Sequence, residues 1–90
     1  MYRILVAEDS KAILRDIVHL IQEAGYEMEI ETAYDGEMAL EILRKFAPDI
    51  IVTDIKMPVI NGLALIQRAK EAYPGVKCVI VSGYGDCIVT

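Results

Sequence analysis

Residues 50–54 read Ile50-Ile51-Val52-Thr53-Asp54, an apolar run that ends in an acid. Continuous runs of this kind are typical of strands that are covered on both faces, as in parallel sheets. Residues 4–7 (Ile-Leu-Val-Ala) and residues 78–81 (Cys-Val-Ile-Val) have the same character, and polar residues or glycine follow each of them. The three runs together predict the buried centre of a parallel sheet.

The segments between these runs carry apolar residues at three- and four-residue spacing, which predicts amphipathic helices. A capping or breaking residue stands near each expected start and end. The expected starts are Ser10, Asp35 and Asn61, and the expected stops are Gly25, Pro48 and Pro74. The stripes expected to be buried are Ile13, Leu14, Ile17, Val18 and Ile21 in the first helix, Met38, Ile42, Leu43 and Phe46 in the second, and Leu63, Ile66, Ala69 and Tyr73 in the third.

Residues 27–33 alternate instead, with Met28 and Ile30 on one side and glutamates on the other. This pattern predicts a half-exposed strand at a sheet edge. The full order is then β-α-β-α-β-α-β, which predicts an α/β fold with a parallel sheet and helices on both faces. Ninety residues fit one domain, spanning residues 1–90.

The composition argues against several classes of partner. A net charge of −5 disfavours direct binding to nucleic acid or to an anionic membrane, because their phosphates repel such a surface. The apolar run at residues 4–7 is too short for a signal peptide or a membrane span, so we expect a cytoplasmic protein. Cys78 and Cys87 fit no metal-ligand spacing and are expected to remain thiols in that compartment.

Side chains that carry oxygen follow three of the expected strands, namely Glu8 and Asp9, Asp54, and Ser82. Because open α/β sheets bind ligands outside the carboxyl ends of their strands, we expect these side chains to converge. Crowded carboxylates repel one another unless a cation neutralises them, and Mg²⁺ fits because it prefers oxygen ligands. The alternative is purely structural, since an acid at a strand end is often a turn former or a helix cap.

Four blocks of sequence bear on this choice. They are Val6-Ala7-Glu8-Asp9-Ser10, Val52-Thr53-Asp54-Ile55-Lys56-Met57-Pro58, Asn61-Gly62 and Val79-Ile80-Val81-Ser82-Gly83-Tyr84-Gly85-Asp86. Together and in this spacing they resemble the receiver domain of two-component response regulators. The resemblance implies a flavodoxin-like fold with strand order 2-1-3-4. It also implies a phosphoacceptor that assists its own phosphotransfer and is not a conventional enzyme.

The resemblance further implies roles by position. Asp54 corresponds to the aspartate that accepts a phosphoryl group from a phosphohistidine of a histidine kinase. Asp9 corresponds to the principal Mg²⁺ ligand, with Glu8 as a companion acid that acts directly or through water. The backbone carbonyl of Lys56 would complete the coordination by the protein. Ser82 corresponds to the switch hydroxyl that bonds the new phosphoryl group.

The resemblance has a gap after the fourth expected strand. A receiver normally continues with a fourth helix, a fifth strand ending in a lysine that pairs with the phosphoryl group, and a fifth helix. Here the pattern departs at residues 87–90, and the lysines at positions 11, 45, 56, 70 and 77 do not replace that lysine. We therefore expect a truncated sheet without its fifth strand, in which the apolar edge of the strand from Cys78 to Val81 lies open.

Two functions are compatible with these features. The first is a receiver module that is phosphorylated at Asp54 by a histidine kinase or a phosphotransfer protein. The second is an unphosphorylated interaction module that forms a homodimer or a domain swap through the edge from Cys78 to Val81. An aspartyl phosphohydrolase would need an acid where Lys56 stands, and an FMN binder would not place two acids in its first loop.

Overall fold

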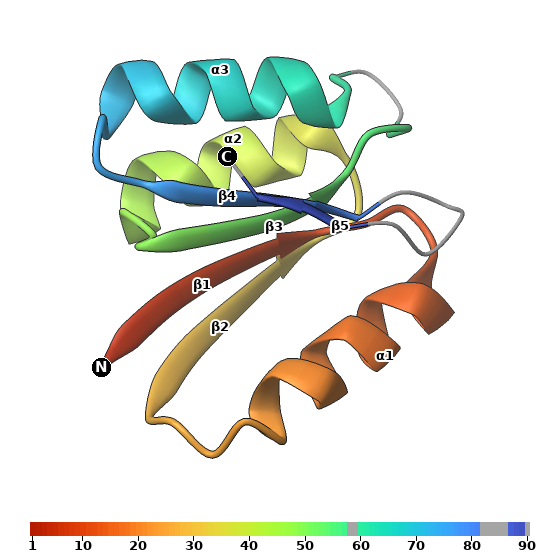
Figure 1. Ribbon diagram of the computed structural model, residues 1–90. Helices are drawn as coiled ribbons and strands as arrows, with labels where there is room; N and C mark the ends of the chain where they lie inside the picture. Colours follow the sequence, from red (N-terminus) through yellow and green to blue (C-terminus); the bar gives the residue numbers. More distant parts are fainter. Residues whose placement is uncertain (58–59, 82–86, 90) are drawn as a thin grey trace.

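The computed structural model describes residues 1–57, 60–81 and 87–89. Within these residues five strands form one sheet, and three helices pack on its two faces (Figure 1). The elements in chain order are β1 (Tyr2–Ala7), α1 (Lys11–Gln22), β2 (Met28–Ala33), α2 (Gly36–Phe46), β3 (Ile50–Asp54), α3 (Gly62–Ala72), β4 (Lys77–Val81) and β5 (Cys87–Val89). Helix α1 covers one face of the sheet, and α2 and α3 cover the other.

The predicted order of the first four strands is confirmed as β2-β1-β3-β4, with all neighbours parallel. In the register Ala7 lies opposite both Ala33 and Thr53, so β1, β2 and β3 approach the same edge together. The residues that follow Ala7 and Thr53 therefore leave the sheet side by side. Strand β2 is an edge strand, as predicted, with Met28 and Ile30 half-buried and its glutamates exposed.

The outer edge of β4 differs from the prediction. Strand β5 pairs antiparallel with β4, and Val79, Ile80 and Val81 lie opposite Val89, Ile88 and Cys87. Residues 87–89 are apolar and partly β-branched, which suits a strand, and an antiparallel partner needs only a short connection. The prediction that this edge of β4 lies open is therefore wrong over residues 79–81.

Each helix begins where the sequence predicts, and each start is capped by a side chain. The hydroxyl of Ser10 accepts from the amide of Ile13 at 3.4 Å at the start of α1. Asp35 Oδ1 accepts from Met38 N at 2.8 Å for α2, and Asn61 Oδ1 accepts from Ala64 N at 2.9 Å for α3. These caps satisfy amides that have no partner within the helix, and they fix where each loop ends.

The predicted buried stripes are confirmed in part, because some of their residues are buried, some are half-buried and three are exposed. The predicted residues that are buried are Leu14, Leu43, Phe46, Ile66 and Ala69. Ile13, Met38 and Leu63 are instead 46%, 36% and 56% exposed. All three lie in the first turn of their helix, where the neighbouring residues Leu14, Ala39 and Leu65 are buried instead.

The core contains Leu5, Ile51, Leu65 and Cys78, which are fully buried. Cys78 is a free thiol, and burial raises its pKa, so it remains an inert core residue as predicted. No helix in the described part of the chain combines the length and the apolar character that a membrane span requires.

Candidate functional site

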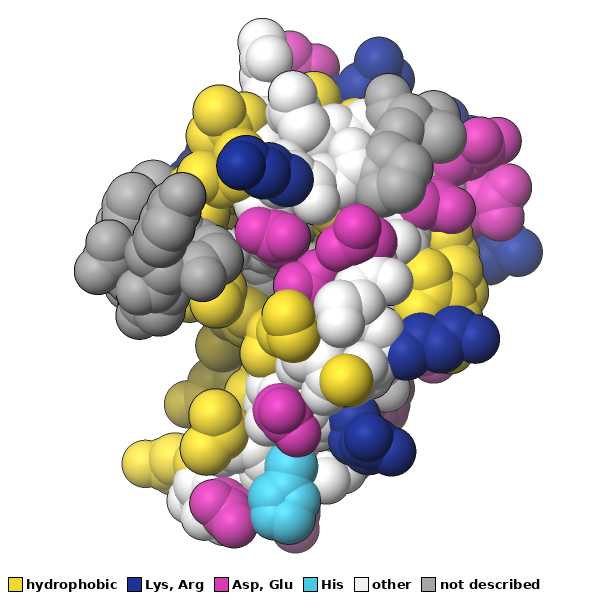
Figure 2. Space-filling model, turned by 90° about the vertical axis from the view of Figure 1, so that its right-hand side faces the viewer, with side chains coloured by type: hydrophobic (Ala, Val, Ile, Leu, Met, Phe, Trp, Pro, Cys, Tyr) yellow, Lys and Arg dark blue, Asp and Glu magenta, His cyan; other side chains and the backbone are white. Residues whose placement is uncertain are grey.

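Three carboxylates meet at the carboxyl edge of the sheet. Glu8 and Asp9 follow β1, and Asp54 ends β3. One carboxylate oxygen from each residue lies within 4.8 Å of the other two. Figure 2 looks onto this edge, where acidic side chains gather near the middle of the face. The structure thus brings together the three acids that the sequence predicts to converge.

The three acids differ in exposure. Glu8 is buried, with 4% of its surface exposed, whereas Asp54 is half-buried and Asp9 is exposed. The amide of Glu8 donates to the carbonyl of Ala33 at 3.0 Å, which continues the ladder between β1 and β2 by one residue. This bond holds the backbone of Glu8 against β2, and Glu8 is the most buried of the three acids.

The surroundings of Glu8 disfavour its charged form. Burial, a hydrogen bond with the side chain of Asp9 and the nearby charges of Asp54 and Asp9 raise the pKa of Glu8 from 4.5 to about 7. The amide of Ser10, which donates to Glu8 Oε2 at 3.4 Å, acts in the opposite direction but is outweighed. The folded protein therefore holds a carboxyl group that ionises near neutral pH.

The described residues provide no basic side chain that pairs with these acids. The ion pairs found among them are Arg3 with Glu29 at 3.9 Å and His19 with Glu23 at 3.0 Å, and both lie away from the site. Three close carboxylates without a basic partner favour a bound cation. The donors are all oxygen, which suits a hard divalent ion such as Mg²⁺. The residues present therefore fit the predicted metal.

The backbone of Asp54 is held by contacts that the sequence did not predict. The Thr53 hydroxyl donates to the carbonyl of Asp54 at 3.0 Å, and Gly62 N donates to the carbonyl of Ile55 at 2.9 Å. Thr53 is a buried polar residue in an apolar run. Thr53 and Gly62 both lie in blocks that carry the receiver resemblance, but nothing in the sequence indicates the contacts that they make.

The predicted roles of Lys56 and Ser82 stay predictions. The side chain of Lys56 is exposed, and no bond to its carbonyl is found among the described residues. Ser82 lies outside the described residues, so its predicted role stays a prediction.

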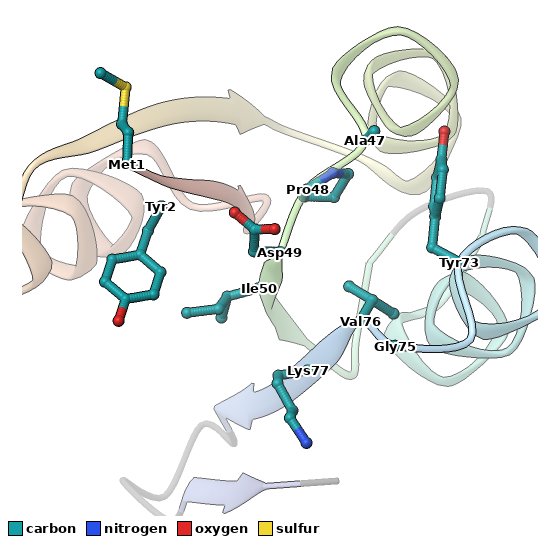
Figure 3. Close-up of a pocket in the computed structure, with 10 residues that line it drawn as sticks. All are labelled: Met1, Tyr2, Ala47, Pro48, Asp49, Ile50, Tyr73, Gly75, Val76 and Lys77. Atoms are coloured by element: carbon teal, nitrogen blue, oxygen red, sulfur yellow. The ribbon is translucent and has the colours of Figure 1, made fainter.

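A hollow of about 620 Å³ lies at the opposite end of the strands (Figure 3). Asp49, Tyr73 and Lys77 are among the residues that line it. Asp49 Oδ2 accepts from the amide of Arg3 at 2.9 Å, so this carboxylate connects the starts of β1 and β3. The hollow holds no cluster of carboxylates among its lining residues and is not the candidate site.

Comparisons with known proteins agree with this geometry. The response regulator receiver domain family matches residues 4–90. The uncharacterized transcriptional regulatory protein YesN of Bacillus subtilis (strain 168) is 36% identical over 87 residues, which cover 96% of this chain and 24% of YesN. The response regulator receiver protein CpdR of Brucella abortus (strain 2308) is 36% identical over 85 residues, which cover 93% of this chain and 68% of CpdR.

The structural comparison gives the same result. A response regulator receiver domain protein from Clostridium thermocellum has a TM-score of 0.84 and 31% identity, over 96% of this chain and 68% of that one. The chain spans about a quarter of the length of YesN and about two thirds of the solved domain. Both the family match and the fold extend over nearly all of the chain. The chain therefore belongs to the response regulator receiver domain family.

Proposed function

We propose that this chain is the phospho-accepting receiver module of a His-Asp phosphorelay, phosphorylated at Asp54 in the presence of Mg²⁺. The observation that carries the proposal is the meeting of Glu8, Asp9 and Asp54 within 4.8 Å, without a basic partner among the described residues. Receiver domains generally bind Mg²⁺ at an acidic pocket and interact with histidine kinases or phosphotransfer proteins. Those two classes are the proposed partners of this chain.

The chemistry assigned to the chain is phosphoryl transfer onto a carboxylate. An oxygen of Asp54 attacks the phosphorus of a phosphohistidine, and the P–N bond breaks as the new O–P bond forms. The imidazole leaves with the electron pair and takes up a proton. Asp54 is suited to this role because it is half-buried at the end of a strand that is paired on both sides, which fixes its position.

The remaining residues are assigned to binding and charge compensation. Glu8, Asp9, Asp54 and the carbonyl of Lys56 are the proposed metal ligands, and Ser82 is the proposed switch hydroxyl. Bound Mg²⁺ supplies positive charge that offsets the phosphoryl oxygens. The chain is not proposed to be a conventional enzyme, and its proposed location is the cytoplasm.

Phosphorylation from a small donor tests this function directly. The chain is incubated with Mg²⁺ and acetyl phosphate, and its intact mass is measured. We expect a gain of one phosphoryl group in the wild type and no gain in Asp54→Asn or in the presence of EDTA. Asp49→Asn is the matched control, because it neutralises an acid at the far end of β3 and is expected to gain the group. A wild type that gains no mass contradicts the proposal.

The alternative function, interaction through the edge of β4, is not favoured. Strand β5 pairs with β4 over Val79, Ile80 and Val81, so the backbone groups that a second chain would need are already bonded.

A further inference from the structure

Gly62 lies against the backbone of Asp54. A methyl group in place of its hydrogen would overlap the carbonyl oxygen of Asp54, lie 2.9 Å from its carbonyl carbon and lie 3.1 Å from the Cα of Ile55. These atoms belong to the main chain of β3 and of the residue after it, so they cannot swing away as a flexible side chain would. Glycine is thus the residue that fits this position with the strand end in its present place.

A second glycine, Gly36, lies against Ile60, two residues before Gly62. A methyl group on Gly36, the first residue of α2, would overlap the carbonyl oxygen of Ile60 and lie 2.8 Å from its carbonyl carbon. Gly62 N also donates to the carbonyl of Ile55 at 2.9 Å, which holds the start of α3 against the end of β3. Ile60 therefore lies against the first turn of α2, and Gly62 lies against the last peptide of β3.

A hydrogen bond fixes the same peptide of Asp54 from another direction. The Thr53 hydroxyl, on a side chain that is 1% exposed, donates to the Asp54 carbonyl at 3.0 Å and also lies 3.9 Å from Met57 Sδ. The Asp54 carboxylate is only half-buried and has no ion pair with a described residue. Its position relative to Glu8 and Asp9 is therefore set mainly by how its own peptide is held.

We propose that Gly62 is a positioning residue of the acidic site, acting with the Thr53 hydroxyl to hold the Asp54 peptide where its carboxylate meets Glu8 and Asp9. This inference rests on the proposed function. A side chain at position 62 pushes the Asp54 peptide or the loop outward, and it separates carboxylates that must share one cation. Displacements of about 1 Å are enough to cost a site much of its function.

The chain contains its own matched control. Gly75, between α3 and β4, has nothing within 4 Å of an added methyl group and does not have the positive φ of Gly25. Gly75→Ala therefore makes the same chemical change as Gly62→Ala, without overlap and without backbone strain.

The test compares Mg²⁺ affinity in wild type, Gly62→Ala and Gly75→Ala by titration calorimetry. Thermal unfolding is recorded first, so that all titrations are done well below each melting temperature. We expect Gly62→Ala to bind Mg²⁺ about tenfold more weakly and to accept phosphate from acetyl phosphate correspondingly more slowly. Gly75→Ala is expected to stay within about twofold of the wild type.

Each result of this test supports or overturns the positioning role of Gly62. A Gly62→Ala protein that melts at a lower temperature yet binds Mg²⁺ as the wild type does would overturn the positioning role. If Gly62→Ala does not fold, Thr53→Val serves instead, since it keeps the shape and removes the bond to Asp54. Thr53→Val should weaken Mg²⁺ binding about threefold, and unchanged binding would overturn the inference. A wild type that binds no Mg²⁺ would overturn the proposed function itself, with this inference.

Discussion

Both ends of the sheet carry carboxylates. The carboxylate at one end is hydrogen-bonded to a neighbouring strand, whereas those at the other end repel one another. At the start of β3, Asp49 Oδ2 accepts from Arg3 N at 2.9 Å, and its carbonyl accepts from Lys77 N at 3.0 Å. The Arg3 guanidinium lies nearby, donating to the carbonyl of Phe46 at 2.9 Å and stacking 5.3 Å from the centre of its ring. Every one of these groups has a partner, and the carboxylate joins β1 to β3.

At the other end Glu8, Asp9 and Asp54 face one another. Glu8 has its pKa raised to about 7, so the fold bears a cost whenever this group is charged. Charged acidic side chains therefore stabilise one end of the sheet and destabilise the other. A carboxylate that bonds neighbouring strands is explained by stability alone. A cluster of carboxylates that repel one another points to a functional site, in which a bound cation supplies the missing positive charge.

The largest expected difference between the two ends is in phosphate acceptance. Asp54→Asn should abolish incorporation from acetyl phosphate, whereas Asp49→Asn should leave its rate within about twofold of the wild type. The reason is that Asp54 is the proposed source of the attacking oxygen, whereas Asp49 lies at the opposite end of the same strand. Intact mass spectrometry over time measures both. Equal rates in the two variants would remove the functional distinction between the ends.

The second difference is in the response of stability to pH. With Glu8 raised to about 7, the folded chain keeps a proton between about pH 4.5 and 7 that the unfolded chain has released. The stability that this bound proton contributes is fully present below about pH 4.5 and is lost as the pH rises through about 7. The free energy of unfolding without metal should fall by roughly 2 kcal/mol between about pH 5 and pH 8.

Urea unfolding in EDTA at several pH values measures this fall. Glu8→Gln should remove most of it, because the amide does not ionise and cannot repel its neighbours. Asp49→Asn should keep it, because Asp49 does not contribute to the raised pKa of Glu8. A wild type whose free energy of unfolding rises over this pH range would show that the surroundings of Glu8 do not disfavour its charged form.

A third difference is in the effect of Mg²⁺. At a concentration tenfold above its dissociation constant, a ligand that binds the folded state alone stabilises it by about 1.4 kcal/mol. We expect this gain in the wild type and in Asp49→Asn near neutral pH, and its loss in Asp54→Asn. Urea midpoints with and without Mg²⁺ measure it. An equal gain in Asp54→Asn would place the ion elsewhere on the chain.

The smallest expected effect is at the amino end. Asp49→Ala removes the bond to the Arg3 amide and should lower the free energy of unfolding by about 1 kcal/mol. Its affinity for Mg²⁺ should be unchanged. A loss of Mg²⁺ affinity in this variant would mean that the two ends are coupled through β3.

The sequence predicts the acidic cluster because the three acids follow strands of one parallel sheet. Parallel strands end at one edge, so Glu8, Asp9 and Asp54 converge once the strands are identified. The different burial of Glu8 and Asp9 was not predictable, because it depends on the bond from Glu8 N to Ala33 and on the atoms packed around the site.

Other features escaped prediction for related reasons. Strand β5 is three residues long, and nothing in its sequence indicates which edge it pairs with. The contact of Gly62 with Asp54 depends on how α3 approaches β3, which local periodicity does not encode. Ile13 and Leu63 belong to apolar stripes, but which side chains of a first helical turn are buried is a property of the assembled layers.

Strand β3 lies in the middle of the five-strand order β2-β1-β3-β4-β5 of the described chain. Because its amides and carbonyls bond to β1 on one side and to β4 on the other, they open to solvent only when the sheet itself comes apart. In hydrogen exchange, β3 is thus expected among the slowest segments, although Asp54 at its tip meets solvent. A chemical change at that tip acts on a rigid base, so any structural response must be carried by the loops and helix ends around it.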